Sequence, residues 1–520
     1  MTISDVPNCI NRLKRKRNWP EHFLKIIAFH RSVYIVFIAA LFLFGYMHVA
    51  DAASRTVYSG ATLINPDSSA IENSRIIVVN ERITCVSGKT ECPGTKEDIN
   101  IDISGRWVTP GLIDTHVHLD FEDNALDHQR RRLAYGVTTV RDASTSQLGQ
   151  LLEHQTHAVA DAPLPNIVIS AVLVPFFEYK NAGEDHESSA LRLRSLGIDA
   201  IKLKNKGPTK HLVSIIKAAK AVGLPVYGHT WYGAPPQSIL EDAINAGLDG
   251  VSHLMGIVSG SQAVPMENMP DGDKDLAGFW EWGKKLWLTT DPDTLDRLID
   301  LMVSKNVWLE PTLTYEYYWD RSISHPYCGF LETEREIYFR DALTWGKQPS
   351  LPPTYPEPYA AMTDFVKRFA DKGGVIVTGT DNKCPGADMN KELHLLREAG
   401  LTPHQALRAA TSHAAKVLGI AHDRGVVAVG QQADFIVFKQ DPLAHIDAKI
   451  ETVILRGYKH NPAVLLEPEI KLFESKRKQA LVNGLLKWGK YPLAILLLTL
   501  IIIRFWMKRK RKANGSTREH

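Results

Sequence analysis

The fold of this chain is indicated first by the stretch Pro110-Gly111-Leu112-Ile113-Asp114-Thr115-His116-Val117-His118-Leu119-Asp120. An apolar strand runs into two histidines that are separated by one residue. On a β-strand, residues i and i+2 point to the same face, so His116 and His118 aim in one direction. A bare His-x-His is weak evidence for a metal site, so the assignment depends on what the rest of the chain adds.

The region that follows, residues 111–419, alternates short apolar strands with helical segments. Residues 211–222 show the helical pattern, with Leu212, Ile215, Ile216 and Ala219 at helical spacing. Eight such β/α units within about 300 residues predict a (β/α)8 barrel rather than an open sheet. The expected strands are 112–114, 137–140, 167–170, 200–203, 225–228, 250–252, 307–309 and 375–378.

Strand-like segments also flank the barrel region on both sides. They lie at 56–58, 61–64 and 75–79 before it, and at 433–438 and 452–455 after it. Neither group alone has enough strands for a stable sheet. We therefore expect an α/β chain in which a small β-sandwich, built from residues 53–110 and 420–470, carries the barrel as an insert.

Four further polar residues stand at the ends of later expected strands. Lys202, His229, His253 and Asp381 end the fourth, fifth, sixth and eighth strands, respectively. Taken singly, each is more readily a packing or surface residue. The carboxyl ends of all barrel strands lie at one mouth, however. An explanation by packing alone would have to apply separately to the residue at each of these strand ends. The sequence therefore predicts a metal site at this mouth.

The chain resembles the amidohydrolase superfamily, close to its imidazolonepropionase-like and prolidase-like (Xaa-Pro or Arg/Lys carboxypeptidase) branch. The resemblance spans about residues 56–458. Family members usually place a Glu directly before the ligand that corresponds to His253, whereas this chain has Ser252 there. The residues that carry the resemblance are 110–118, 136–142, Lys202, His229, His253, 379–381, 410–415 and 430–434.

The resemblance implies a centre with two divalent metal ions. The first ion would be held by His116, His118 and Asp381, and the second by His229 and His253. A carboxylated Lys202 would bridge the two, because a protonated lysine would repel the cations; Lys204, on the same strand face, is the competing bridge. Zn²⁺ suits imidazole and carboxylate ligands best, with Mn²⁺ and Fe²⁺ as alternatives.

The same resemblance implies hydrolysis of a carbon–nitrogen bond (amide, peptide or cyclic amide) by a metal-activated hydroxide. Asp381 would accept a proton from the attacking water and pass it to the leaving nitrogen, and His253 is the second candidate catalytic residue. A small-molecule or dipeptide-like substrate would be bound by aromatic loop residues, with Trp231, Tyr232 and Tyr315 as candidates.

Three alternatives remain open. The first is a lactonase, esterase or phosphotriesterase on the same centre. The second is a mononuclear deaminase-like site, against which Lys202 argues, and the third is a tethered barrel whose metal is only structural. Inside the barrel, Arg141 is expected to pair with its neighbour Asp142.

Composition excludes several classes of protein. Hydrophobic residues make up 44% and charged residues 23% of the 520 residues, which is typical of a globular chain and not of a disordered one. A net charge of +3 is too balanced for a nucleic-acid partner bound by phosphate neutralisation.

Both ends of the chain indicate export and a membrane anchor. Residues 1–52 combine a basic segment, the apolar run 33–44 and small residues at 49–53, as in a signal peptide or signal anchor. Residues 471–520 contain a basic segment, the apolar run 491–507 and a basic tail. We expect a transmembrane segment there, or a basic helix lying on the membrane, with the catalytic domain periplasmic or otherwise extracytoplasmic and the tail cytosolic.

The five cysteines are too few for a scaffold built from disulfides. Cys9 falls within the signal, so four would reach an oxidising compartment. We expect Cys85 to pair with Cys92, and Cys328 with Cys384, although four cysteines allow three connectivities.

Overall fold

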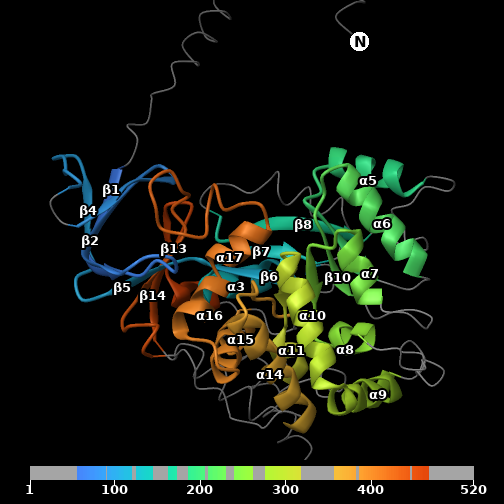
Figure 1. Cartoon of the computed structure of the whole chain (residues 1–520). Coiled ribbons are helices and arrows are strands. Elements are labelled where there is room, and N and C mark those ends of the chain that lie inside the picture. The colour runs from blue at the N-terminus through green and yellow to red at the C-terminus, as the bar shows by residue number, and fades with distance from the viewer. Residues whose placement is uncertain are drawn as a thin grey trace, which may run out of the picture. The chain divides into compact units, whose positions relative to one another are not determined.

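The computed structural model describes residues 55–88, 91–119, 125–143, 162–172, 185–204, 209–229, 239–261, 276–317, 356–381, 386–445 and 448–467. Figure 1 shows the helices and strands that these residues form. The expected signal at residues 1–52 and the expected transmembrane segment at 491–507 lie outside the described residues.

Seven consecutive parallel strands form the sheet at the centre of the barrel, in the order β12-β11-β10-β9-β8-β7-β6. Each strand pairs with the next one along the chain, as in a barrel whose strands are joined by helices. The strands are β6 (Leu112–Val117), β7 (Val137–Asp142), β8 (Asn166–Val172), β9 (Ala200–Lys204), β10 (Val226–His229), β11 (Gly250–Ser252) and β12 (Trp308–Glu310).

The eighth expected strand, residues 375–378, closes the ring although it forms only an isolated bridge. On one side, Ile376 bridges to Leu309 of β12 in parallel. On the other side, the Thr115 backbone N–H of β6 donates to the Thr378 carbonyl at 2.9 Å. The prediction of a parallel barrel with eight strand positions is therefore confirmed, with the eighth position more irregular than the rest.

Helices connect the barrel strands and bury one face each. In α6, the four residues at helical spacing, Leu212, Ile215, Ile216 and Ala219, are all buried, while Lys220 pairs with Asp249 at the surface. The helices are α3 (Ala125–Ala134), α5 (His186–Ser195), α6 (Thr209–Ala221), α7 (Ile239–Ala246), α8 (Met255–Ser261), α9 (Leu276–Thr289), α10 (Pro292–Ser304), α11 (Leu313–Tyr317), α14 (Pro356–Asp371), α15 (Ala387–Glu398), α16 (Pro403–Ala409) and α17 (Ser412–Val417).

The strand segments that flank the barrel belong to one eight-stranded sheet, in which N-terminal and C-terminal strands lie together (Figure 1). The two groups meet where β5 pairs antiparallel with β13, with Val108 opposite Val437. The strands are β1 (Arg55–Leu63), β2 (Ile71–Val79), β3 (Arg82–Ser87), β4 (Ile99–Asp102), β5 (Trp107–Pro110), β13 (Phe435–Phe438), β14 (Ile450–Leu455) and β15 (Tyr458–His460).

Asp434 ties this sheet to the barrel. Its backbone carbonyl accepts from Gly111 at 3.0 Å, at the point where the chain passes from β5 into β6. Its carboxylate accepts from the Asn166 side chain at 3.1 Å and from the Arg456 backbone at 2.7 Å. Because Asn166 also donates to the Thr138 carbonyl of β7, the start of the barrel is held against the sheet by a buried polar network.

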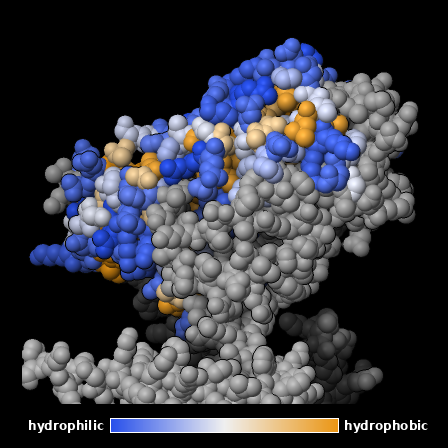
Figure 2. Space-filling view, turned by 90° about the horizontal axis from the view of Figure 1, so that it is seen from below, coloured by the Kyte–Doolittle hydropathy of each residue, from blue (hydrophilic) through white to orange (hydrophobic). Residues whose placement is uncertain are grey.

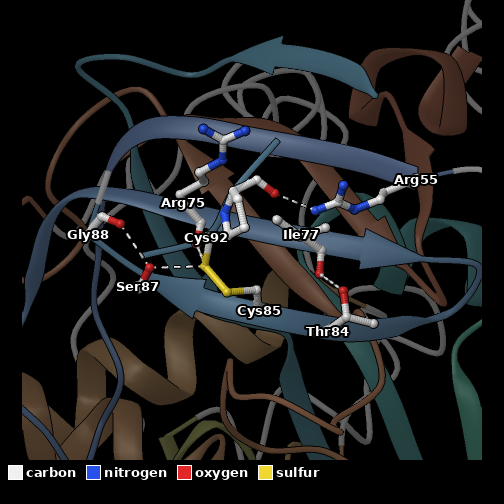
Figure 3. The surroundings of a disulfide bond; sticks show 9 residues. Arg55, Arg75, Ile77, Thr84, Cys85, Ser87, Gly88 and Cys92 are labelled. Carbon is white, nitrogen blue, oxygen red and sulfur yellow. Dashed lines mark hydrogen bonds between the residues drawn. A yellow bond between two sulfur atoms is a disulfide. The ribbon is translucent and has the colours of Figure 1, made fainter. Parts of the chain in front are cut away.

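A disulfide joins Cys85 of β3 to Cys92, with the two Cα atoms 6.0 Å apart (Figure 3). The bond closes a short loop next to β2, where the Ser87 hydroxyl lies 2.9 Å from the Cys92 sulfur. This is the local pairing expected from the sequence. Cys328 and Cys384 lie outside the described residues, so their pairing stays a prediction.

The surface of the described residues carries only scattered apolar side chains on the face shown in Figure 2, among predominantly hydrophilic ones. The large exposed apolar residues come from separate elements, for example Leu191 of α5 and Leu288 of α9. Within the parts of the chain that the structure describes, no helix has both the length and the apolar character needed to cross a bilayer.

The disulfide is expected to stabilise the β-sheet by restricting the unfolded chain. Replacing Cys92 by Ser opens a loop with a sequence separation of 7, and should lower the free energy of unfolding by about 2–3 kcal/mol. Urea denaturation of both proteins under oxidising conditions measures this difference. Reductant should bring the wild type to the level of the variant and leave the variant unchanged; equal stability before reduction would contradict the assignment.

Candidate metal centre

The six predicted ligands all lie at the carboxyl ends of the barrel strands. His116 stands near the end of β6, Lys202 in β9 and His229 at the end of β10. His118 and His253 directly follow β6 and β11, and Asp381 lies three residues beyond the expected eighth strand at 375–378. The fold thus delivers these side chains to one mouth, although the strands that carry them are far apart in sequence.

Short distances connect these side chains into one cluster around Asp381. Its carboxylate lies 3.2 Å from Nε2 of His118 and 3.3 Å from Nε2 of His253. Lys202 Nζ lies 3.1 Å from His116 Nε2, on the other side of the same cluster. The ring of His229 is centred 4.6 Å from that of His253. The structure therefore brings all six predicted residues together.

The tightest group of donors is His116, His253 and Asp381, whose ligand atoms lie within 4.8 Å of one another. This group mixes residues that the resemblance assigns to different ions, since His253 belongs to the predicted second metal. A set of two imidazole nitrogens and a carboxylate oxygen is the chemistry that Zn²⁺ and related divalent ions bind.

A hydrogen-bond partner holds the far side of each buried imidazole ring. Nδ1 of His116 lies 2.5 Å from the carboxylate of Glu310, and Nδ1 of His253 lies 2.7 Å from the hydroxyl of Thr312. The Thr312 hydroxyl donates its own hydrogen to the Pro311 carbonyl at 2.8 Å, so it accepts from His253. Both rings therefore carry hydrogen on Nδ1 and turn an unprotonated Nε2 toward Asp381, as metal-binding histidines do.

The electrostatics of the cluster favour neutral imidazoles and ionised carboxylates. Burial lowers the pKa of His116 to about 4, and it also lowers the pKa of His253 well below its ordinary value. Burial acts to raise the pKa of Asp381, but the neighbouring imidazoles act together, including that of His118 through a hydrogen bond, and hold that pKa below the usual range. These are the protonation states that a cation requires of its ligands.

Two of the clustered residues have strained backbones. His253 has φ of 65° and Asp381 has φ of 42°, in the left-handed region that residues other than glycine seldom adopt. Such strain costs of order 1–3 kcal/mol and is concentrated at functional sites. The turn directs each side chain across the mouth immediately after its strand ends.

Beneath the cluster, the carboxylate of Glu310 is completely buried and forms contacts with three other strands. Arg141 of β7 donates to Oε1 at 2.7 Å, and Ser252 of β11 donates to Oε2 at 2.7 Å. The hydroxyl of Thr115 in β6 also contacts Oε1. Burial acts to raise the pKa of Glu310, but Arg141, His116 and Lys202 together outweigh it and hold that pKa well below its ordinary value.

The expected pairing of Arg141 with Asp142 is wrong. Arg141 donates to Glu310 and to the Thr115 carbonyl, and its guanidinium lies 3.5 Å over the ring of Tyr227. Asp142 instead accepts from the Leu119 backbone N–H at 2.9 Å. The reason is geometric: successive residues of a strand point to opposite faces, so adjacent side chains do not meet.

Sequence reasoning missed Glu310 and Thr312, the partners of His116 and His253. The available signal was the position of Glu310 at the end of the seventh expected strand, in register with the other strand-end residues. Like Lys202, Glu310 is an ionisable residue at the end of an expected barrel strand.

The remaining candidates are only partly described by the structure. Tyr315 lies beside the cluster, with its ring centred 5.4 Å from that of His253. Trp231 and Tyr232 lie outside the described residues, as does the side chain of Lys204. Lys202 is the lysine that reaches His116.

The profile of the amidohydrolase family matches residues 107–458, which is more than half of the chain. The chain belongs to the amidohydrolase family. Membership identifies it as a hydrolase that acts on carbon–nitrogen bonds, in a family that typically binds metals.

Similar proteins agree with this assignment. The imidazolonepropionase of Psychromonas ingrahamii is 24% identical over 429 residues, covering 74% of this chain and 91% of that protein. Among solved structures, a Xaa-Pro dipeptidase with bound methionine in the active site has a TM-score of 0.54 at 20% identity, covering 78% of this chain and 100% of the other. Phenylurea hydrolase B has a TM-score of 0.56 at 18% identity, covering 79% and 97%. These structural likenesses show the fold.

A second buried carboxyl near the cluster makes stability depend on pH. Burial raises the pKa of Glu316 to about 8. One of its oxygens accepts from the Leu254 backbone at 3.1 Å, while the other has no hydrogen-bond partner among the described residues. The folded chain therefore keeps a proton that the unfolded chain releases at a lower pH, so raising the pH favours unfolding.

We expect the stability of the metal-free wild type to fall, relative to Glu316→Gln, by about 1.4 kcal/mol per pH unit between roughly pH 5 and 8. Above that range the difference should level off. Denaturation curves at several pH values measure it, with Glu241→Gln on the exposed surface of α7 as the control. A difference that does not change with pH would show that Glu316 does not titrate in this way.

Proposed function

We propose that the chain is a metal-dependent hydrolase of an amide bond in a small molecule or dipeptide-like substrate. The observation that carries this proposal is the convergence of His116 Nε2, His253 Nε2 and the Asp381 carboxylate, while the opposite ring nitrogens are engaged by other groups. A bound metal ion needs ligand atoms whose lone pairs point to one place, on side chains that are fixed by hydrogen bonds at their other end.

The residues fit a centre of two divalent ions, with Zn²⁺ as the first choice. His116, His253 and Asp381 supply the tight group, and His118 and His229 lie within reach of its members. Lys202 is buried against His116, where a protonated ammonium would oppose cation binding. We propose that its amine is carboxylated, so that it offers negative oxygen ligands.

Bound at this place, the ions would polarise the substrate carbonyl and make water acidic enough to react near neutral pH. Asp381 is then the proton carrier of the chain. Its pKa is held low, so its carboxylate is ready to accept a proton from the attacking water and deliver it to the leaving nitrogen. The Nε2 of His253 lies 3.3 Å from that carboxylate, which places its imidazole beside the proton carrier.

The likeness to imidazolonepropionase over 74% of the chain, and to a structure described as a Xaa-Pro dipeptidase, supports an amide substrate. Tyr315 offers an aromatic face beside the cluster against which the acyl part of such a substrate can pack.

Replacing Asp381 by Asn should retain much of the bound metal and lower kcat by at least about 10³-fold, because the amide cannot accept the proton. Zn²⁺ content and the initial rates of hydrolysis of dipeptides, cyclic amides, lactones and phosphotriesters measure the two effects in the purified full-length protein. Chelation should abolish the wild-type activity and Zn²⁺ should restore it.

Tyr458→Phe, on the exposed strand β15, is the matched control and should behave as the wild type. Faster turnover of lactones or phosphotriesters than of any amide would support the alternative activity on this centre. Full activity in a metal-loaded Asp381→Asn protein would exclude Asp381 as the proton carrier. A wild type that binds metal but turns over none of these substrates would leave only a structural role for the metal.

We also propose that the enzyme is exported and tethered to a membrane by its C-terminal segment. The disulfide between Cys85 and Cys92 supports an oxidising compartment, and the basic and apolar segments at both ends of the sequence support the anchor.

The protein is tagged at its C-terminus and expressed in cells whose outer layers are then removed while the plasma membrane stays intact. External protease should digest the barrel and leave a short membrane-bound fragment whose C-terminal tag is protected. A cytosolic marker protein controls for leakage. Recovery of the intact protein in the soluble fraction would contradict the anchor.

A further inference from the structure

Glu310 is a buried anion whose place is fixed by groups on three neighbouring strands. Arg141 and Ser252 each donate to it at 2.7 Å, and the guanidinium of Arg141 is always charged. A carboxylate so placed can only accept hydrogen bonds. At 2.5 Å, Nδ1 of His116 must therefore carry the hydrogen between them, which leaves Nε2 as a lone pair.

The other side of the same ring agrees with this assignment. Nε2 of His116 lies 3.1 Å from the amine of Lys202 and 3.8 Å from the carboxylate of Asp381. The ring of His116 is completely buried among the described residues. Glu310 thus selects one of the two tautomers of His116 and fixes the direction in which Nε2 points.

The fold leaves room for this arrangement at one particular residue. A Cβ atom on Gly379 would lie 2.6 Å from Cβ of His116 and 2.8 Å from Cγ of Glu310. Only a glycine at this position of the eighth strand segment allows the carboxylate and the imidazole to meet behind it.

A side chain on the neighbouring strand β11 can reach the place that the Glu310 carboxylate occupies. Ser252 and Glu310 are direct partners in the register of β11 and β12, and the Ser252 hydroxyl already touches the carboxylate. Paired residues of adjacent strands lie about 5 Å apart and point to the same face. A carboxylate rooted at position 252 would therefore reach the same donors.

We propose that Glu310 is the residue that positions His116 for metal binding, and that it supplies from β12 a carboxylate that could equally be rooted at position 252 of β11. The proposal deepens the proposed metal-dependent function and rests on it. The carboxylate of Glu310 and the hydroxyl of Ser252 can then be exchanged between the two adjacent strands without loss of the hydrogen bond to His116.

The first test asks whether Zn²⁺ binding needs the carboxylate itself, whichever of the two positions, 310 or 252, carries it. In the full-length protein, Glu310→Gln should weaken Zn²⁺ binding by about 10–100-fold, measured by competition with a chelator. The exchange S252E/E310S keeps the same set of side-chain atoms and should restore the affinity to within a few-fold of the wild type. Loss of affinity in the folded exchange variant would overturn the proposal, as would wild-type affinity in Glu310→Gln.

A second variant covers the case in which Glu310→Gln fails to fold because Arg141 is left as a buried unpaired charge. The double variant R141M/E310Q removes both charges. We expect it to fold and still to bind Zn²⁺ weakly, because the orienting acceptor is missing. Wild-type affinity in this variant would show that Glu310 serves only as the partner of Arg141.

A readout without metal tests the tautomer directly. With ¹⁵N-labelled histidine, the His116 signals, assigned by their loss in His116→Asn, should report hydrogen on Nδ1 in the wild type and in S252E/E310S, and a changed tautomer balance in R141M/E310Q. Hydrogen on Nε2 in the wild type would overturn the proposal. Failure of the wild type to hydrolyse any amide would instead count against the proposed function alone, since the tautomer and Zn²⁺ affinity are measured without substrate.

Discussion

The constraint on which the centre of this molecule depends is the buried negative charge of Glu310. A carboxylate without access to water must find donors for its oxygens, or the fold loses several kcal/mol. Arg141, Ser252 and His116 meet that demand from three different strands. Satisfying one anion therefore ties β6, β7 and β11 to β12, and the same hydrogen bonds fix the imidazole that faces the mouth. Barrel stability and the geometry of the site share one set of contacts.

The sequence was sufficient to predict the barrel and the six clustered side chains because both follow from topology. Parallel strands joined by helices bring all their carboxyl ends to one rim, so a residue such as His229 or Asp381 could be placed from its position after a strand, with no knowledge of its contacts. The buried face of α6 was equally accessible, since helical spacing alone identifies it. Patterns that need only the period of an element or the direction of a strand were read correctly.

Features that depend on contacts between strands could not be derived in this way. The role of Glu310 depends on the register that sets it beside Ser252, and register across a parallel sheet leaves no mark in a single sequence. The partner of Arg141 was misassigned for a related reason: adjacency along the chain was taken for adjacency in space. The flanking strands form one sheet through the pairing of β5 with β13, which joins segments separated by the whole barrel.

The strained turns at His253 and Asp381 are held in place by hydrogen bonds to neighbouring strand segments. The backbone N–H of Asp381 donates to the His116 carbonyl at 2.9 Å, and that of His253 to the Glu310 carbonyl at 2.9 Å. The buried carboxylate of Asp114 accepts from both the backbone and the hydroxyl of Thr380, one residue before the turn. Hydrogen bonds of this kind contribute about 1 kcal/mol each, which is enough to offset strain of order 1–3 kcal/mol. These hydrogen bonds therefore fix the two turns from which the side chains of His253 and Asp381 project, and they tie the geometry of the cluster to the pairing of the barrel strands.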